Sequence, residues 1–77
     1  MNEASPQGGP FITIVVNGQE RSVKSDCTIS AFLQDLAVAP ARVVVQLDGV
    51  IIPRADFAQA RLHEGCHLEI VTLVGGG

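Results

Sequence analysis

The sequence predicts a two-layer α+β domain, in which one mixed β-sheet of four or five strands carries a single main helix on one face. Three observations predict this class. Segments rich in β-branched residues suit strands, an apolar stripe at helical spacing suits one helix, and an Asn-Gly pair suits a hairpin turn. The strand-like segments are residues 11–16, 42–47 and 67–73. The helical stripe lies in residues 29–37, and the turn pair is Asn17-Gly18.

The chain opens with a predicted hairpin over residues 11–23. Residues 11–16 read Phe-Ile-Thr-Ile-Val-Val, a β-branched and aromatic run. Asn17-Gly18 is the strongest short-range hairpin signal, because a type I′ turn needs positive φ at both central residues. The return strand, residues 19–23, is polar enough to face water on one side.

The predicted helix spans residues 29–37. Ile29, Phe32, Leu33 and Leu36 recur at helical spacing and form one apolar stripe. Thr28 is the predicted N-cap, since its hydroxyl can accept a hydrogen bond from an amide of the first turn. The helix should end before Pro40, because the residue that precedes a proline disfavours the α conformation.

The second half of the chain predicts three further strands. Residues 42–47 are apolar almost throughout, which favours a central strand. Asp48-Gly49 is a second turn signal, and a short strand at 50–52 follows it and ends at Pro53. Residues 54–60 suit one loose helical turn anchored by Phe57, and residues 67–73 form the last strand. The first and last strands are expected to be parallel neighbours in the sheet centre, joined by a right-handed connection.

Alternation along the strands assigns a face to each side chain. Those expected to face the helix are Ile12, Ile14, Val43, Val45, Leu47, Leu68 and Ile70. The opposite, open face then receives Val44, Gln46, Val71 and Leu73. An apolar patch with a polar rim marks a partner surface, although ordinary folded surface is largely apolar as well. Leu73 and Val74, next to the C-terminus, are the strongest candidates for partner contact.

Composition limits the classes of function. Seventy-seven residues suffice for one small domain, and residues 1–10 read as a flexible leader before a domain at 11–73. The net charge is −3 and the five cations are scattered, which argues against nucleic-acid binding. A signal peptide and an apolar run long enough to span a bilayer are both missing from the sequence. We therefore expect no membrane association, a cytoplasmic location and a monomer when partners are absent.

The cysteines and histidines do not predict a chemical site. Cys27 and Cys66 are interpreted as reduced packing residues, with a disulfide or a redox role as the alternatives. The run from His63 to His67 contains metal-ligating residue types, but it forms a turn around Gly65. A closed zinc site needs four ligands, so we predict no metal.

The chain ends in a flexible tail, Val74-Gly75-Gly76-Gly77. Glycine has no Cβ and adopts positive φ freely, so this tail could enter a channel too narrow for other residues. A tail of this kind, directly after a strand, suits a C-terminal carboxylate that is itself the reactive group. The alternative is an ordinary frayed terminus.

Several of these segments together resemble the thiamine-biosynthesis sulfur carrier family, whose fold is the ubiquitin-like β-grasp. The resemblance covers residues 12–77, and the extended N-terminus and Cys66 depart from the family pattern. It rests on Val16-Asn17-Gly18, on Thr28-Ile29 with Phe32-Leu33, on Leu47 to Arg54, on Glu64-Gly65, and on Leu68 to Gly77.

The resemblance implies a carrier that is a co-substrate and not an enzyme, and that binds no cofactor. An E1-like adenylyltransferase would use ATP and Mg²⁺ to adenylate Gly77, and sulfur from a donor protein would convert it into a thiocarboxylate. Gly75 and Gly76 would thread the partner's active site, and thiazole synthase would receive the sulfur. The alternatives are a carrier for molybdopterin or another thiolation pathway, a ubiquitin-like protein modifier, and an inert binding module.

Overall fold

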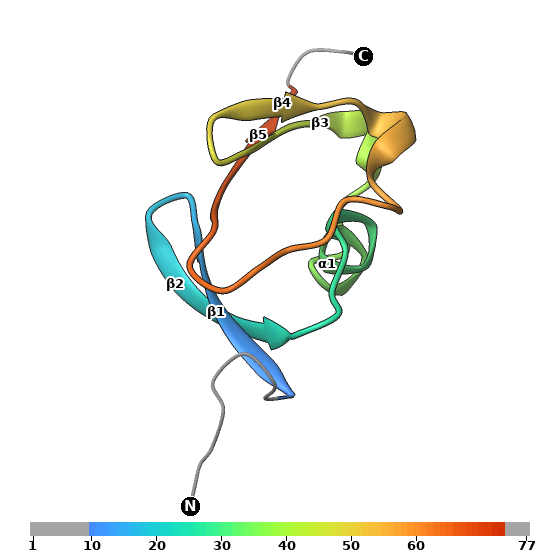
Figure 1. The fold of residues 1–77 in the computed structure, drawn as a ribbon. Coiled ribbons are helices and arrows are strands. Elements are labelled where there is room, and N and C mark those ends of the chain that lie inside the picture. Colours follow the sequence, from blue (N-terminus) through green and yellow to red (C-terminus); the bar gives the residue numbers. More distant parts are fainter. Residues whose placement is uncertain (1–9, 74–77) are drawn as a thin grey trace, which may run out of the picture.

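The computed structural model describes residues 10–73, in which five strands form one mixed sheet with a helix on one face (Figure 1). The sheet order is β2-β1-β5-β3-β4. β1 and β5 are parallel neighbours, and the other adjacent pairs are antiparallel. This confirms the two-layer α+β class, the strand number and the central parallel pair. The strands are β1 (Phe11–Val16), β2 (Gln19–Lys24), β3 (Val43–Leu47), β4 (Val50–Ile52) and β5 (His67–Thr72).

Two tight turns set the registers of the outer strands. Asn17 and Gly18 have φ values of 50° and 83°, and Asp48 and Gly49 have 51° and 85°. Both turns therefore have positive φ at both central residues, as a two-residue type I′ hairpin requires. The turns confirm the two predicted hairpins, and β2 continues one residue further than predicted, to Lys24.

The helix α1 (Ile29–Asp35) begins as predicted but ends two residues earlier. The Thr28 hydroxyl oxygen accepts the Ala31 amide at 3.1 Å, which confirms the N-cap. At the other end Ala37 adopts φ 59°, and its amide donates to the Gln34 carbonyl while that of Val38 donates to Leu33. This pair of bonds closes the last turn in the pattern that helices commonly end with, usually on a glycine. Because an alanine holds the left-handed position, the sequence carries no glycine to mark the end.

Replacement of Ala37 by glycine is expected to stabilise the fold by about 0.5–1 kcal/mol. A left-handed alanine costs about 1–2 kcal/mol, and part of the relief is offset because glycine makes the unfolded chain more flexible. Urea denaturation measures the change. A midpoint that stays the same or falls would show that the left-handed conformation of Ala37 is not strained.

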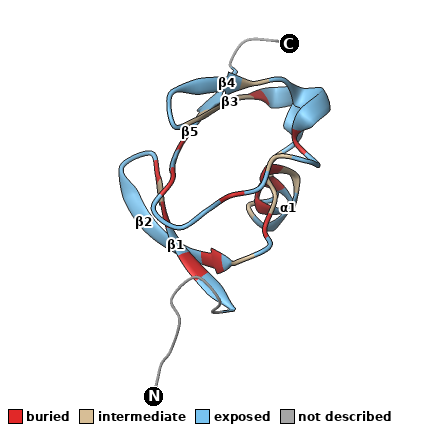
Figure 2. Ribbon diagram, viewed as in Figure 1, coloured by how far each residue is buried: buried red, intermediate tan, exposed pale blue. Residues whose placement is uncertain are grey.

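The core lies between the sheet and α1 (Figure 2). From the helix, Ile29, Phe32 and Leu33 are buried, and they pack with buried strand residues of β1, β2, β3 and β5. Phe57 is 3% exposed, and its carbonyl accepts the Ser30 amide at 3.0 Å, so its prediction as an anchor is confirmed.

Short 3₁₀ turns stand where the sequence predicts longer elements. The turn η2 (Pro40–Arg42) takes up Arg42, so β3 begins one residue later than predicted. Only η3 (Arg54–Asp56) forms a helical turn within the predicted range 54–60. Pro40 opens η2, where its fixed φ is already helical, and Pro53 precedes η3 in the extended conformation that proline also adopts.

Candidate functional site

The candidate site is the open face of the sheet where β5 approaches the C-terminal tail. Val44 on β3 lies directly opposite Val71 on β5, and Gln46 lies opposite both Glu69 and Ile51 of the neighbouring strands. Side chains of opposed residues share a face. The sheet therefore brings four apolar side chains to this face, here called the tail-root patch: Val44, Ile51, Val71 and Leu73.

Exposure supports the predicted assignment of faces. Val71 is 55% exposed and Leu73 47% exposed, whereas Val44 and Gln46 are half-buried. Of the residues predicted to face the helix, Leu47 and Ile70 are partly buried against the core. The others in that set are buried in the core: Ile12, Ile14, Val43, Val45 and Leu68.

Ile51 is a member of the patch that sequence reasoning missed. It is 61% exposed, and the turn at Asp48-Gly49 pairs Leu47 with Val50 and therefore Gln46 with Ile51. The signal was present in the sequence, because a two-residue turn fixes the register of both its strands. Val50, also 61% exposed, falls on the opposite face.

A backbone hydrogen bond fixes the position at which the chain leaves the sheet. β5 ends at Thr72, which pairs with Val43. One residue later, the Leu73 amide donates to the Arg42 carbonyl at 2.7 Å. Leu73 is therefore tied to the start of β3, and the segment from Val74 starts at a fixed point. Val74, Gly75, Gly76 and Gly77 lie outside the described residues, so their predicted roles stay predictions.

A polar cluster surrounds Asp48 at the β3–β4 turn. One carboxylate oxygen accepts the His67 amide at 2.8 Å, and the other pairs with the His63 ring nitrogen Nε2 at 2.9 Å. The His67 amide first, and the His63 ring second, lower the pKa of Asp48. The cluster connects the turn to the start of β5. Among residues 10–73, no three His, Cys, Asp or Glu residues are grouped closely enough to hold a metal.

Acid should weaken the fold through Asp48. Its folded-state pKa is below the unfolded value, so its contacts stabilise fully above the ordinary aspartate pKa of about 3.9 and are lost as the pH falls through the folded value. Asp48→Asn keeps a residue type that tolerates positive φ. The free energy of unfolding of this variant should fall less with pH than that of the wild type. Urea denaturation of both proteins from about pH 6 to about pH 3 measures it. Parallel stability curves for the two proteins would contradict the assignment.

Both cysteines are free and buried, which confirms their interpretation as packing residues. Burial is the largest cause that raises the pKa of each thiol. Cys66 is 1% exposed. A nucleophilic thiol needs a lowered pKa and access to solvent. Both cysteines instead have a raised pKa and are buried.

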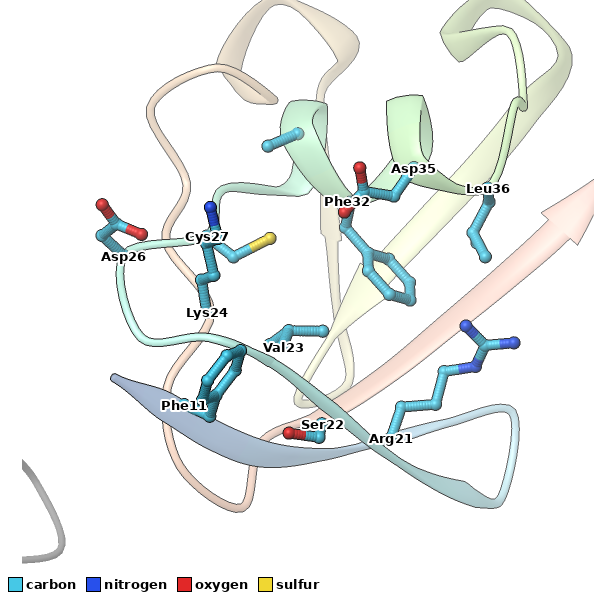
Figure 3. Close-up of a pocket in the computed structure, with 11 residues that line it drawn as sticks. Phe11, Arg21, Ser22, Val23, Lys24, Asp26, Cys27, Phe32, Asp35 and Leu36 are labelled. Atoms are coloured by element: carbon cyan, nitrogen blue, oxygen red, sulfur yellow. The ribbon is translucent and has the colours of Figure 1, made fainter. Parts of the chain in front are cut away.

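A hollow lies between α1 and the edge strand β2 (Figure 3). Its lining combines apolar side chains such as Leu36 and Phe32 with charges of both signs. The Arg21 guanidinium carbon lies 5.9 Å from the centre of the Phe32 ring, within range of a cation–π contact. Of the predicted site residues that the structure describes, Val44, Gln46, Val71 and Leu73, none lines this hollow. No helix within residues 10–73 has the length and apolar character needed to cross a membrane.

The fold matches that of a solved thiamine biosynthesis protein. A solved structure of the thiamine biosynthesis protein ThiS from Geobacter metallireducens superposes with a TM-score of 0.73 at 29% identity, and covers 86% of this chain and all of that one. This confirms the β-grasp fold.

Sequence comparison finds relatives of two lengths. A thiazole synthase from Paramagnetospirillum magneticum is 38% identical over 64 residues, which are 83% of this chain but only 20% of that protein. The chain thus spans about a fifth of the thiazole synthases it matches. An uncharacterised protein, ycf40 of Pyropia yezoensis, is 30% identical over 66 residues, 93% of its length. Residues 12–77 match the model of the ThiS family, nearly the whole chain. The chain therefore belongs to the ThiS family of ubiquitin-like sulfur carriers in thiamine biosynthesis.

Proposed function

We propose that this carrier bears sulfur as a thiocarboxylate on Gly77 and delivers it to the formation of the thiazole ring of thiamine. The observation that carries the proposal is the tail-root patch, an exposed apolar surface at the point where a glycine-rich tail leaves a fixed strand. The four side chains of the patch, all within the described residues 10–73, are apolar and supply no acid, base or nucleophile themselves. The protein acts as a co-substrate, and its partners perform the chemistry.

The chemistry takes two steps at the Gly77 carboxyl group. A carboxylate is a poor electrophile, so the Gly77 carboxylate oxygen first attacks the α-phosphorus of ATP, and pyrophosphate leaves. Hydrosulfide (HS⁻) released by a donor protein then attacks the carbonyl carbon of the acyl-adenylate, and its proton is lost to leave the thiocarboxylate. The new C–S bond replaces the C–O bond to AMP, which leaves with the electron pair. Mg²⁺ and ATP belong to the E1-like adenylyltransferase, and the carrier itself binds no cofactor.

The geometry suits delivery of a chain end into an enclosed site. Leu73 is tied to Arg42, and four residues follow it, which at full extension reach about 14 Å. Gly75, Gly76 and Gly77 add no side chain to the width of this tail, so a narrow channel can admit it. The tail-root patch contacts the partner at the channel mouth. Such docking turns the reaction into one between positioned groups, and positioning is the carrier's contribution to the rate.

Thiazole synthase is the proposed recipient of the sulfur. The relative from Paramagnetospirillum magneticum bears that name, and a fifth of its length aligns with 83% of this chain. A carrier-like segment in the same polypeptide as the synthase is what one expects of two activities that work together. The adenylyltransferase and the synthase would each bind the tail-root patch in turn, because each must admit the same tail.

Intact-mass spectrometry tests the function. The chain is incubated with an E1-like adenylyltransferase, ATP, Mg²⁺ and a sulfur donor. A gain equal to the exchange of one oxygen for sulfur supports a carrier, and transfer of that sulfur on addition of thiazole synthase supports the pathway. Covalent adducts on lysines of other proteins would instead identify a modifier, and an unchanged mass would refute the proposal.

A further inference from the structure

The parallel ladder between β1 and β5 is short, and side chains extend it at both ends. Only Val15↔His67 and Val16↔Leu68 are paired in register. Before them, the Thr13 amide donates to the Glu64 carboxylate at 3.0 Å. After them, the Asn17 side chain contacts Ile70, 53 positions further along the chain.

The side-chain amide of Asn17 replaces two missing hydrogen bonds of the ladder. The backbone amide of Val15 donates to the Cys66 carbonyl, and the backbone amide of Asn17 donates to the Leu68 carbonyl, both at 2.9 Å. In a continued parallel ladder, Ile70 would next donate to the Asn17 backbone carbonyl and accept from residue 19. The hairpin turn carries the Asn17 carbonyl and the amide of residue 19 away from β5, towards β2. Instead, the Ile70 amide donates to Asn17 Oδ1 at 2.8 Å, and Asn17 Nδ2 donates to the Ile70 carbonyl at 3.2 Å.

These two bonds lie close to the origin of the tail. On its other edge β5 is paired with β3 as far as Thr72, and Leu73 is bonded to Arg42. On the β1 edge Ile70 is the last residue that is held, and Asn17 holds it. Without this contact the final part of β5 would have a partner on one edge only, and a strand held on one edge opens more easily than one held on both.

We propose that Asn17 is a positioning residue for the reaction at Gly77. Its side chain keeps the end of β5 in the sheet, so that the tail starts from a fixed place and direction. The inference rests on the proposed function and adds to it a residue outside the partner surface. A carrier with a frayed β5 must reorder that strand before it docks, and only the ordered fraction binds. The cost therefore falls on binding, and the reaction of the bound tail proceeds at its usual rate.

Two variants at this position separate the side chain from the turn. Asn17→Gly keeps the type I′ turn, which accepts glycine at its first central position, and removes both bonds to Ile70. Asn17→Asp also tolerates the turn and keeps an oxygen for the Ile70 amide, but it loses the donor to the Ile70 carbonyl. Thr28→Ala is the control, because it also removes one side-chain bond without a change of charge, at the helix N-terminus.

Hydrogen exchange of the free carrier tests the structural part. Asn17→Gly should lower protection of the Ile70 amide by about fivefold to tenfold, the factor expected for the loss of a net hydrogen bond. Protection of the Val45 amide in β3 should change only as far as global stability changes. In Asn17→Asp, protection of the Ile70 amide should lie between that of the wild type and that of Asn17→Gly. Unchanged protection of Ile70 in Asn17→Gly would overturn the inference.

Steady-state adenylation, followed by pyrophosphate release with the E1-like enzyme, tests the functional part. Asn17→Gly should raise KM for the carrier at unchanged kcat, by a factor smaller than the loss of Ile70 protection because KM follows the ordered fraction, Asn17→Asp should raise KM less, and Thr28→Ala should leave it unchanged. An equal rise in Thr28→Ala and Asn17→Gly would reduce Asn17 to a general stabiliser and overturn the inference. A wild-type chain that is not adenylated would refute the proposed function, and hydrogen exchange would still decide whether Asn17 holds Ile70.

Discussion

Addition of a single alanine after Gly77 is expected to abolish sulfur loading. The extra residue moves the carboxylate beyond the position at which the partner activates it, and it places a Cβ in a channel built for bare backbone. Intact-mass spectrometry after incubation with the E1-like enzyme, ATP and a sulfur donor should show no exchange of oxygen for sulfur. The fold should be unaffected, because the described structure is complete without this residue.

The matched control carries one additional alanine after Met1, so that the two proteins have the same composition and mass. This control should load sulfur as the wild type does. If the variant with alanine after Gly77 also gains sulfur, the carboxylate of Gly77 is not the reactive group, and the proposed chemistry is wrong.

Leu73→Asp is expected to lower kcat/KM for adenylation by at least about tenfold while the fold stays intact. Leu73 is 47% exposed, so a carboxylate there is hydrated in the free carrier. In the complex the partner would cover it, and an unpaired buried charge is costly. Pyrophosphate release at varied carrier concentration measures the loss, and circular dichroism checks the fold.

Val50→Asp provides the control for this charge. Val50 is 61% exposed, and register places it on the opposite face from Leu73. The two variants therefore have the same net charge but differ in the face that carries the aspartate. Equal losses in both would point to a general electrostatic effect and would exclude the tail-root patch as the docking surface.

The sequence predicts most of this fold because its local signals agree with one another. Asn17-Gly18 and Asp48-Gly49 define two hairpins, Thr28 marks the helix start, and alternation assigns the faces of the strands. The helix end was missed, because Ala37 adopts a conformation that glycine usually marks. Propensity describes single residues, whereas the closing bonds at Ala37 depend on how the following chain is held.

The candidate site is predictable to a smaller extent. The open face follows from alternation, and Ile51 would have followed from the register of the second turn. The role of Asn17 could not be predicted, because its partner Ile70 is 53 positions away and only the assembled sheet brings the two together. In the sequence, Asn17 is indistinguishable from an ordinary turn residue.

The central place of β5 has a consequence for the synthesis of this protein. Of the five described strands, β5 is the last to leave the ribosome, and it separates β1 from β3. Until it emerges, the two hairpins have no shared backbone partner, and a prematurely terminated chain lacks the middle of its sheet. Folding is thus linked to the synthesis of β5, so that products truncated before this strand are expected to stay unfolded and open to proteolysis. A folded molecule is thereby one whose translation has passed through β5.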